Sequence, residues 1–112
     1  MIDLSGDLLD RPIGIALSIP VRTQAASATF RVFVDRRGGN TPPTLNVTIE
    51  HRDATSESWS TAGVFTAITA TGLAQKSIQA GLKAWARLKC EESGGSSDGF
   101  VSAHVLPPVW AP

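Results

Sequence analysis

The side chains best suited to nucleophilic or acid–base chemistry are few and widely spaced in this sequence. There are two histidines, His51 and His104, and one cysteine, Cys90. Nucleophilic catalysis needs a nucleophile within hydrogen-bond reach of a base, and neither histidine lies in a recognisable motif. A Cys90–His104 dyad is geometrically open, but the alternation around Cys90 favours a small buried hydrophobe. We therefore predict a protein that is not an enzyme.

Metal and cofactor sites are equally hard to assemble from these residues. Two distant histidines and one cysteine match no zinc spacing. The loop with Asp53 and Glu57 lacks the alternating oxygen ligands of a calcium site, and no glycine-rich phosphate loop is present. We expect no cofactor and no metal.

Tryptophan and arginine residues indicate surface binding instead. Trp59 lies in the polar loop Asp53–Ser60, where it either folds back onto the protein or anchors a partner. Trp85, Arg87 and Lys89 share one face of a predicted strand, and tryptophan with arginine is typical of protein interfaces.

Both ends of the chain carry apolar residues that gain nothing from exposure to water. Residues 1–12 form an arm that is either free or orders against a neighbour. Pro107 and Pro108 should prevent residues 106–112 from continuing a central strand, so we expect an extended, Pro-rich tail. The predicted protein-contact residues are Leu4, Leu8, Leu9, Trp59, Trp85, Arg87, Val109 and Trp110.

Composition excludes several classes of partner. The 112 residues include 10 Lys plus Arg and 10 Asp plus Glu, so the formal net charge is zero. A nucleic-acid-binding protein normally has a basic excess, so we expect no nucleic acid partner. No segment approaches the roughly 18 apolar residues needed to span a bilayer, so we expect no membrane insertion. The N-terminus lacks the features of a signal peptide, which indicates synthesis in a cytoplasm.

Alternating apolar and polar residues predict strands over 28–35 and 45–50, because successive side chains on a strand point to opposite faces. Further strands are expected over 13–19, 64–69 and 100–105. Residues 73–89 support two interpretations. Either strands at about 74–80 and 84–90 flank a turn near Gly81, which we prefer, or the segment is a helix. Frequent Gly and Pro residues favour short strands throughout.

The predicted fold is mainly β, a two-sheet β-sandwich or jelly-roll-like domain. We expect an N-terminal arm over 1–12, the sandwich over 13–105 and the C-terminal tail over 106–112.

About half of the chain, from Val47 to Val105, resembles small structural proteins of tailed bacteriophages. The resemblance rests on Val47–His51, a polar loop ending in Trp59, Gly63–Ala70, Trp85-Ala86-Arg87-Leu88-Lys89 and Phe100-Val101-Ser102. The chain departs from that pattern in having tryptophan rather than tyrosine at position 85 and an alanine-rich stretch around residue 74.

The resemblance implies a capsid decoration (cement) protein. Such a protein is a virion component on the capsid surface, binds the major capsid protein and is commonly a homotrimer. An alternative is a carbohydrate- or host-surface-binding module of a phage tail or adhesin, with Trp59 and Trp85 as its aromatic platform. A small enzyme using His51, His104 or Cys90 is the third hypothesis.

Overall fold

Strict alternation of buried and solvent-facing side chains builds the two strands at the centre of the fold, β4 (Ala28–Gly38) and β5 (Thr44–Arg52). The computed structural model describes residues 2–5, 15–17 and 20–111, and the side chains of residues 20–111. In β5, Leu45, Val47 and Ile49 are fully buried, as expected for a strand with one face against a core. The strands predicted over 28–35 and 45–50 are confirmed.

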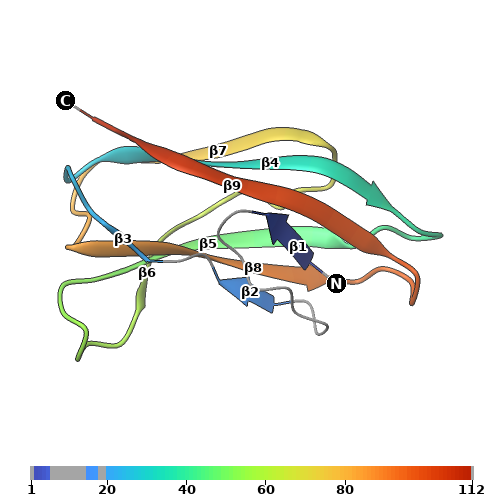
Figure 1. Cartoon of the computed structure of the whole chain (residues 1–112), viewed down its shortest axis with the longest axis horizontal. Helices are drawn as coiled ribbons and strands as arrows, with labels where there is room; N and C mark the ends of the chain where they lie inside the picture. The colour runs from blue at the N-terminus through green and yellow to red at the C-terminus, as the bar shows by residue number, and fades with distance from the viewer. Residues whose placement is uncertain (1, 6–14, 18–19, 112) are drawn as a thin grey trace.

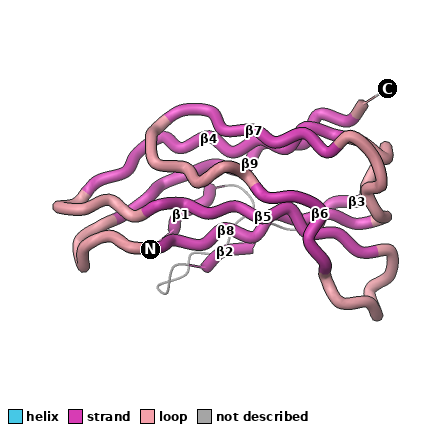
Figure 2. Tube along the Cα trace, turned by 180° about the vertical axis from the view of Figure 1, so that it is seen from behind, coloured by secondary structure: helices cyan, strands magenta, loops and turns pink. Residues whose placement is uncertain are grey.

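The strands form two sheets, which lie as two layers in Figures 1 and 2. Sheet A has the order β1-β9-β4-β7, and sheet B has the order β2-β8-β5-β6, with β3 also pairing with β8. The remaining bounds are β1 Ile2–Ser5, β2 Ile15–Leu17, β3 Val21–Arg22, β6 Ser60–Val64, β7 Gly72–Ile78, β8 Trp85–Ser93 and β9 Phe100–Trp110. All pairings are antiparallel except that of β1 with β9. The predicted mainly β, two-sheet sandwich is confirmed, and the jelly-roll description stays a prediction.

The core lies between the two sheets. Burying one large apolar side chain stabilises a fold by about 1.5–3 kcal/mol, and both sheets supply such residues. Its members are Ala28, Phe30, Val32, Val34, Leu45, Val47, Ile49, Phe65, Ile68, Ala86, Leu88, Cys90, Val101 and Ala103. Because these side chains face inward, their alternating neighbours on each strand form the outer faces of the sandwich.

The segment after Gly63 differs from the strand predicted over residues 64–69. The strand β6 ends at Val64, and the next residues form an arch from sheet B toward sheet A. Phe65 and Ile68 are buried, while Thr66 and Ala67 between them are exposed. This spacing of three residues is not that of a strand. Backbone hydrogen bonds from Phe65 to Val47 and between Ile68 and Leu45 hold the arch against β5.

Residues 73–89 form two strands rather than a helix. The strands β7 and β8 flank a turn in which Gly81 has a φ of 81°, a value that favours glycine. The preferred interpretation is therefore confirmed. The described part of the chain contains no helix, and so none long and apolar enough to cross a membrane.

The C-terminal segment corrects a second prediction. Strand β9 continues through Pro107 and Pro108 to Trp110, so these prolines do not end it. They fall where the register between β4 and β9 shifts, with Leu106 opposite Arg31 and Val109 opposite Thr29. A bulge tolerates proline because it removes the need for a ladder hydrogen bond. In addition, β1 pairs with Val101–His104, so among the described residues no strand pairs with the prolines on that side of β9.

The two ends of the chain also lie closer to the sandwich than the arm and tail interpretation implies. Residues 2–5 form β1 alongside β9, and Trp110 packs against the core with its ring edge-to-face to Phe30, 6.3 Å between centroids. Trp110 is partly buried and anchors the end of β9 to the core, and its role as a contact residue stays a prediction. The predicted contact residues Leu8 and Leu9 lie outside the described residues.

Candidate protein-binding faces

The loop between β5 and β6 returns Trp59 to the sheet. A Glu57 carboxylate oxygen (Oε1) accepts hydrogen bonds from the backbone N–H groups of Asp53 (2.8 Å) and Ala54 (3.0 Å). The Arg52 guanidinium donates to the carbonyl oxygens of Thr55 (3.3 Å) and Glu57 (3.1 Å). These contacts close the loop, and the fold-back alternative for Trp59 is the one that the structure contains.

Trp59 rests on two arginines from neighbouring strands of sheet B. The guanidinium carbons of Arg52 and Arg87 each lie 4.3 Å from its ring centroid, well inside the range of a cation–π contact. Strand β3 adds a third such pair, since Arg22 lies 5.5 Å from the ring centroid of Trp85. Arg22 and Arg52 are both register partners of Trp85, on either side of β8. We call this outer surface of sheet B, formed by Arg22, Arg52, Trp59, Trp85 and Arg87, the Arg–Trp face.

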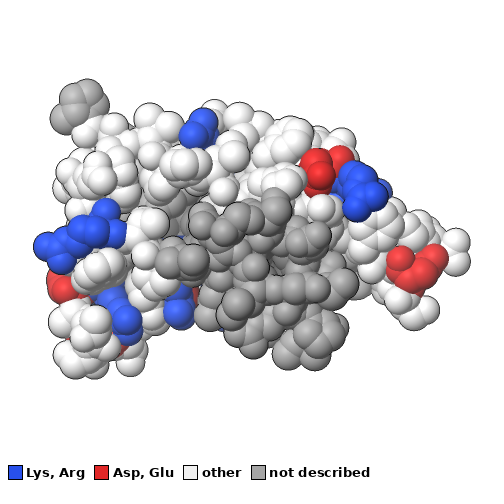
Figure 3. All heavy atoms as spheres, viewed as in Figure 1, with Lys and Arg blue, Asp and Glu red and all other residues white. Residues whose placement is uncertain are grey.

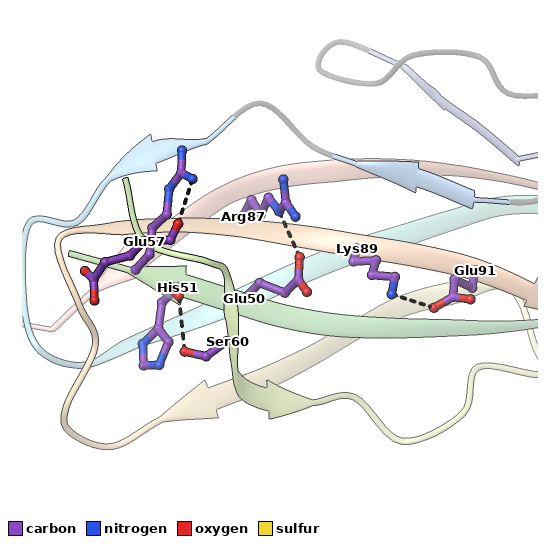
Figure 4. Close-up of polar contacts among 8 residues, drawn as sticks. Glu50, His51, Glu57, Ser60, Arg87, Lys89 and Glu91 are labelled. Atoms are coloured by element: carbon purple, nitrogen blue, oxygen red, sulfur yellow. Dashed lines mark hydrogen bonds and ion pairs between the residues drawn. The ribbon is translucent and has the colours of Figure 1, made fainter. Parts of the chain in front are cut away.

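Ion pairs continue the Arg–Trp face along β8, as Figure 4 shows. The Nε of Arg87 lies 2.8 Å from a Glu50 carboxylate oxygen, with both side chains mostly covered, and Lys89 pairs with Glu91 at 3.3 Å. Basic side chains gather near the ends of β3 and β8 in Figure 3. Stacking on an aromatic ring leaves the in-plane N–H donors of a guanidinium directed outward, which suits carboxylate and carbonyl oxygens.

The outer surface of sheet A has a different composition. Phe33 on β4 lies between Leu73 on β7 and His104 on β9, and Phe33 and Leu73 are 40% and 54% exposed. The His104 ring stacks on Phe33 with a centroid distance of 6.4 Å, and Val109 further along β9 is 52% exposed. We call this surface, centred on Phe33 and Leu73, the apolar face.

The carboxylate of Asp35 lies beside the side chains of the apolar face. Asp35 accepts from His104, whose Nε2 is 3.4 Å away. Hydrogen bonding by Ser102 and, to a lesser extent, by His104 lowers the pKa of the Asp35 carboxyl, outweighing its desolvation. The apolar face therefore carries a negative charge at Asp35 at neutral pH.

The residues considered for catalysis lie apart. Cys90 points into the core and burial raises the pKa of its thiol to about 12, whereas His104 stacks on the outer surface of sheet A. The Nδ1 of His51 accepts a hydrogen bond from the backbone N–H of Lys83 at 3.2 Å, and burial, with a smaller contribution from Lys83, lowers the pKa of His51. Within the described residues, no three His, Cys, Asp or Glu side chains come together as metal ligands.

The predicted contact residues divide between the two sheets. Trp59, Trp85 and Arg87 come together on sheet B. Val109 and Trp110 lie on β9 of sheet A, and the backbone of Leu4 in β1 pairs with β9 at Ala103. Sequence reasoning missed Arg22 and Arg52, because their contacts depend on strand register. It also missed Phe33 and Leu73, although Phe33 stands among Thr29, Arg31 and Asp35 on the polar side of its strand.

Comparison with known proteins adds no relative: no family model, no curated protein and no solved structure matches this chain.

Proposed function

We propose that this protein is a non-enzymatic virion structural protein, a capsid decoration (cement) protein that binds the major capsid protein shell as a homo-oligomer. The single observation that carries the proposal is the Arg–Trp face, which gathers two tryptophans and three arginines on one outer surface. Trp and Arg are the residue types most enriched among the side chains that dominate binding energy at interfaces.

The geometry of the Arg–Trp face supports protein binding in a second way. The indoles and the ion pair between Glu50 and Arg87 hold the guanidinium groups in fixed positions, so less conformational entropy is lost when a partner binds. Arg22 is exposed beside Trp85. A guanidinium group suits carbonyl and carboxylate oxygens such as those on a capsid surface.

The phage resemblance supplies the identity of the partner in this proposal. The polar loop ending in Trp59 and the sequence Trp85-Ala86-Arg87-Leu88-Lys89 are both part of that pattern, and both contribute to the Arg–Trp face. The resemblance favours a trimer, whereas the outer surface of sheet A suits a dimer, and the sedimentation experiment described below distinguishes the two. A location on the capsid surface stays a prediction.

Co-sedimentation tests the proposal. Cells express this protein together with the other proteins of the genome that encodes it. Their lysate is separated on a density gradient, and the protein is detected by antibody. A decoration protein sediments with particles that contain the major capsid protein, in a constant ratio to it. If the protein stays at the top of the gradient while capsids form, the proposal is wrong.

A matched pair of variants tests the assigned face. Arg22→Gln removes a charge from the Arg–Trp face, and Lys76→Gln removes one from β7 of sheet A, where Lys76 is also exposed. We expect Arg22→Gln to weaken particle binding about 10-fold, because losing one interface arginine costs on the order of 1–2 kcal/mol. Lys76→Gln should bind as the unmodified protein does.

A carbohydrate- or host-surface-binding module is the alternative, favoured by the presence of Trp59 and Trp85 on one face. The arginines already stacked against both rings reduce the ring surface open to a sugar. A glycan-array signal that disappears in Trp59→Ala would support this alternative over the cement protein.

A further inference from the structure

The apolar face has opposite charges on the two sides of its centre. On β4, Arg31 lies two residues before Phe33 and Asp35 two residues after it, with Asp35 at the bulge where the register to β9 shifts between Val34 and Arg36. All three side chains belong to the outer surface, since the alternate residues Val32 and Val34 are fully buried. A positive and a negative group therefore flank an exposed aromatic ring on opposite sides along β4.

Both flanking groups are held in place by neighbours on β9. Arg31 donates to the carbonyl oxygen of Pro107 at 3.0 Å, and Asp35 lies 3.4 Å from His104. The contact of Arg31 leaves its charge in place, because a backbone carbonyl is neutral, and the lowered pKa of Asp35 keeps that carboxylate ionised at neutral pH. The remaining described charge on this surface, Arg36, lies 5.8 Å from the ring of Phe100, further from Phe33.

We propose that the apolar face binds a second copy of this chain about a two-fold axis that passes over the row Leu73–Phe33–His104. Such an axis reverses the strand direction of the second copy. It brings Phe33 onto its own equivalent and places Arg31 of each copy opposite Asp35 of the other. An isologous interface requires this property, that residue i meets residue j and residue j meets residue i.

The pairing of Arg31 with Asp35 across the interface identifies a second copy of the chain as the partner. A parallel arrangement of the two copies would place like charges opposite one another, which disfavours it. Stacked sheets lie about 10 Å apart, a separation that the side chains of Phe33, Leu73 and Arg31 can span from both sides. The exposed apolar side chains thereby leave water. This inference does not depend on the proposed capsid role, since it rests on a different face.

Exchanging the charges at positions 31 and 35 tests directly whether Arg31 of one copy pairs with Asp35 of the other. Sedimentation velocity over a range of concentrations gives the dimer dissociation constant of the purified protein. Asp35→Arg places two arginines opposite one another at both ends of the interface, and we expect the dissociation constant to rise at least about 10-fold. The double variant Arg31→Asp with Asp35→Arg should restore it to within about 3-fold of the original value, because the pairs are re-formed with signs reversed.

Two controls keep the outcome clear. Ser56→Asp changes a charge on the exposed loop between β5 and β6 of sheet B, away from the apolar face, and should leave the dissociation constant unchanged. Circular dichroism melting shows whether each variant folds, and Phe33→Ser provides a second way to disrupt the interface if a charge variant does not. A protein that is monomeric at all concentrations, a trimer, or a double variant as weak as Asp35→Arg would each overturn the proposal.

Discussion

The two outer faces of the sandwich differ in how far the chain itself occupies their side chains. On the Arg–Trp face, guanidinium groups lie against both indoles and Arg87 pairs with Glu50. On the apolar face, Phe33 and Leu73 stay 40% and 54% exposed, and His104 stacks against the Phe33 ring. The arginines and tryptophans of the first face therefore already contact one another, whereas the second face gains most of its free energy only when a partner covers it.

This difference suggests two separate binding roles. A face whose arginines are already positioned can bind polar groups with little loss of entropy. A face with exposed apolar side chains between opposite charges suits a second copy of itself. Both faces rest on the same core. Substitutions can therefore be chosen to disrupt both faces, to disrupt one face only, or to change the hydrogen bond between His51 and Lys83.

Removing core volume should disrupt both faces at once and have the largest effect. Leu45 is fully buried and its backbone pairs with Ile68 in the arch. Leu45→Ala should lower the free energy of unfolding by about 2–5 kcal/mol, through lost burial and a residual cavity. Urea denaturation followed by tryptophan fluorescence measures this. A loss below about 1 kcal/mol would contradict the packing described for sheet B.

Removing the central indole of the Arg–Trp face should have a smaller effect, confined to sheet B. Trp59→Ala eliminates two cation–π contacts and the apolar cover over Arg52 and Arg87. We expect unfolding to become easier by about 1–2 kcal/mol. The matched variant Trp59→Phe keeps a ring in place and should recover part of that loss. Equal losses in both variants would mean that the ring contacts contribute little.

Acid should act through His51, which follows Glu50 in β5 and points to the other side of the strand from Arg52. Burial lowers the pKa of His51 below its ordinary value near 6.5, so the unfolded chain binds a proton more readily than the folded one. Stability should therefore fall as the pH decreases below about 6.5, and the loss is complete below the folded pKa. In His51→Asn, a side-chain oxygen replaces the acceptor for Lys83 without titrating.

Chemical denaturation at pH 7.5 and pH 5 measures this effect. The unmodified protein should lose stability between the two values, and His51→Asn should lose less. Asp35 contributes at lower pH, because its folded pKa lies below 3.8 and its stabilisation is lost as the pH falls through that folded value. If both proteins lose the same amount above pH 4.5, His51 is not the group responsible.

Local pattern was sufficient to predict much of the fold. The alternation in residues 28–35 and 45–50 fixed which side chains enter the core, and Gly81 marked the turn between β7 and β8. The prediction for residues 64–69 was wrong because β-branched residues there form an arch, in which burial recurs every three residues. The prediction for Pro107 and Pro108 was wrong because a bulge in the pairing of β4 with β9 accommodates them.

The candidate faces depend on information that the sequence does not display locally. Trp85 and Arg87 were predicted to share a face because they alternate along one strand. Arg22 reaches Trp85 only through the register of β3 on β8, and Arg52 reaches Trp59 only once its loop has closed. Phe33 stood on the polar side of its strand, where alternation alone does not separate an exposed ring from a buried one.

The central claim is that the two faces act separately, and sedimentation velocity on three proteins tests it most directly. The unmodified chain, Phe33→Ser and Trp59→Ala are compared at matched concentrations, with circular dichroism to show that each is folded. We predict that the unmodified chain and Trp59→Ala form dimers with similar dissociation constants, while Phe33→Ser sediments as a monomer. Dimers of Phe33→Ser as stable as those of the unmodified chain, or an equal loss in Trp59→Ala, would contradict the assignment of self-association to the apolar face.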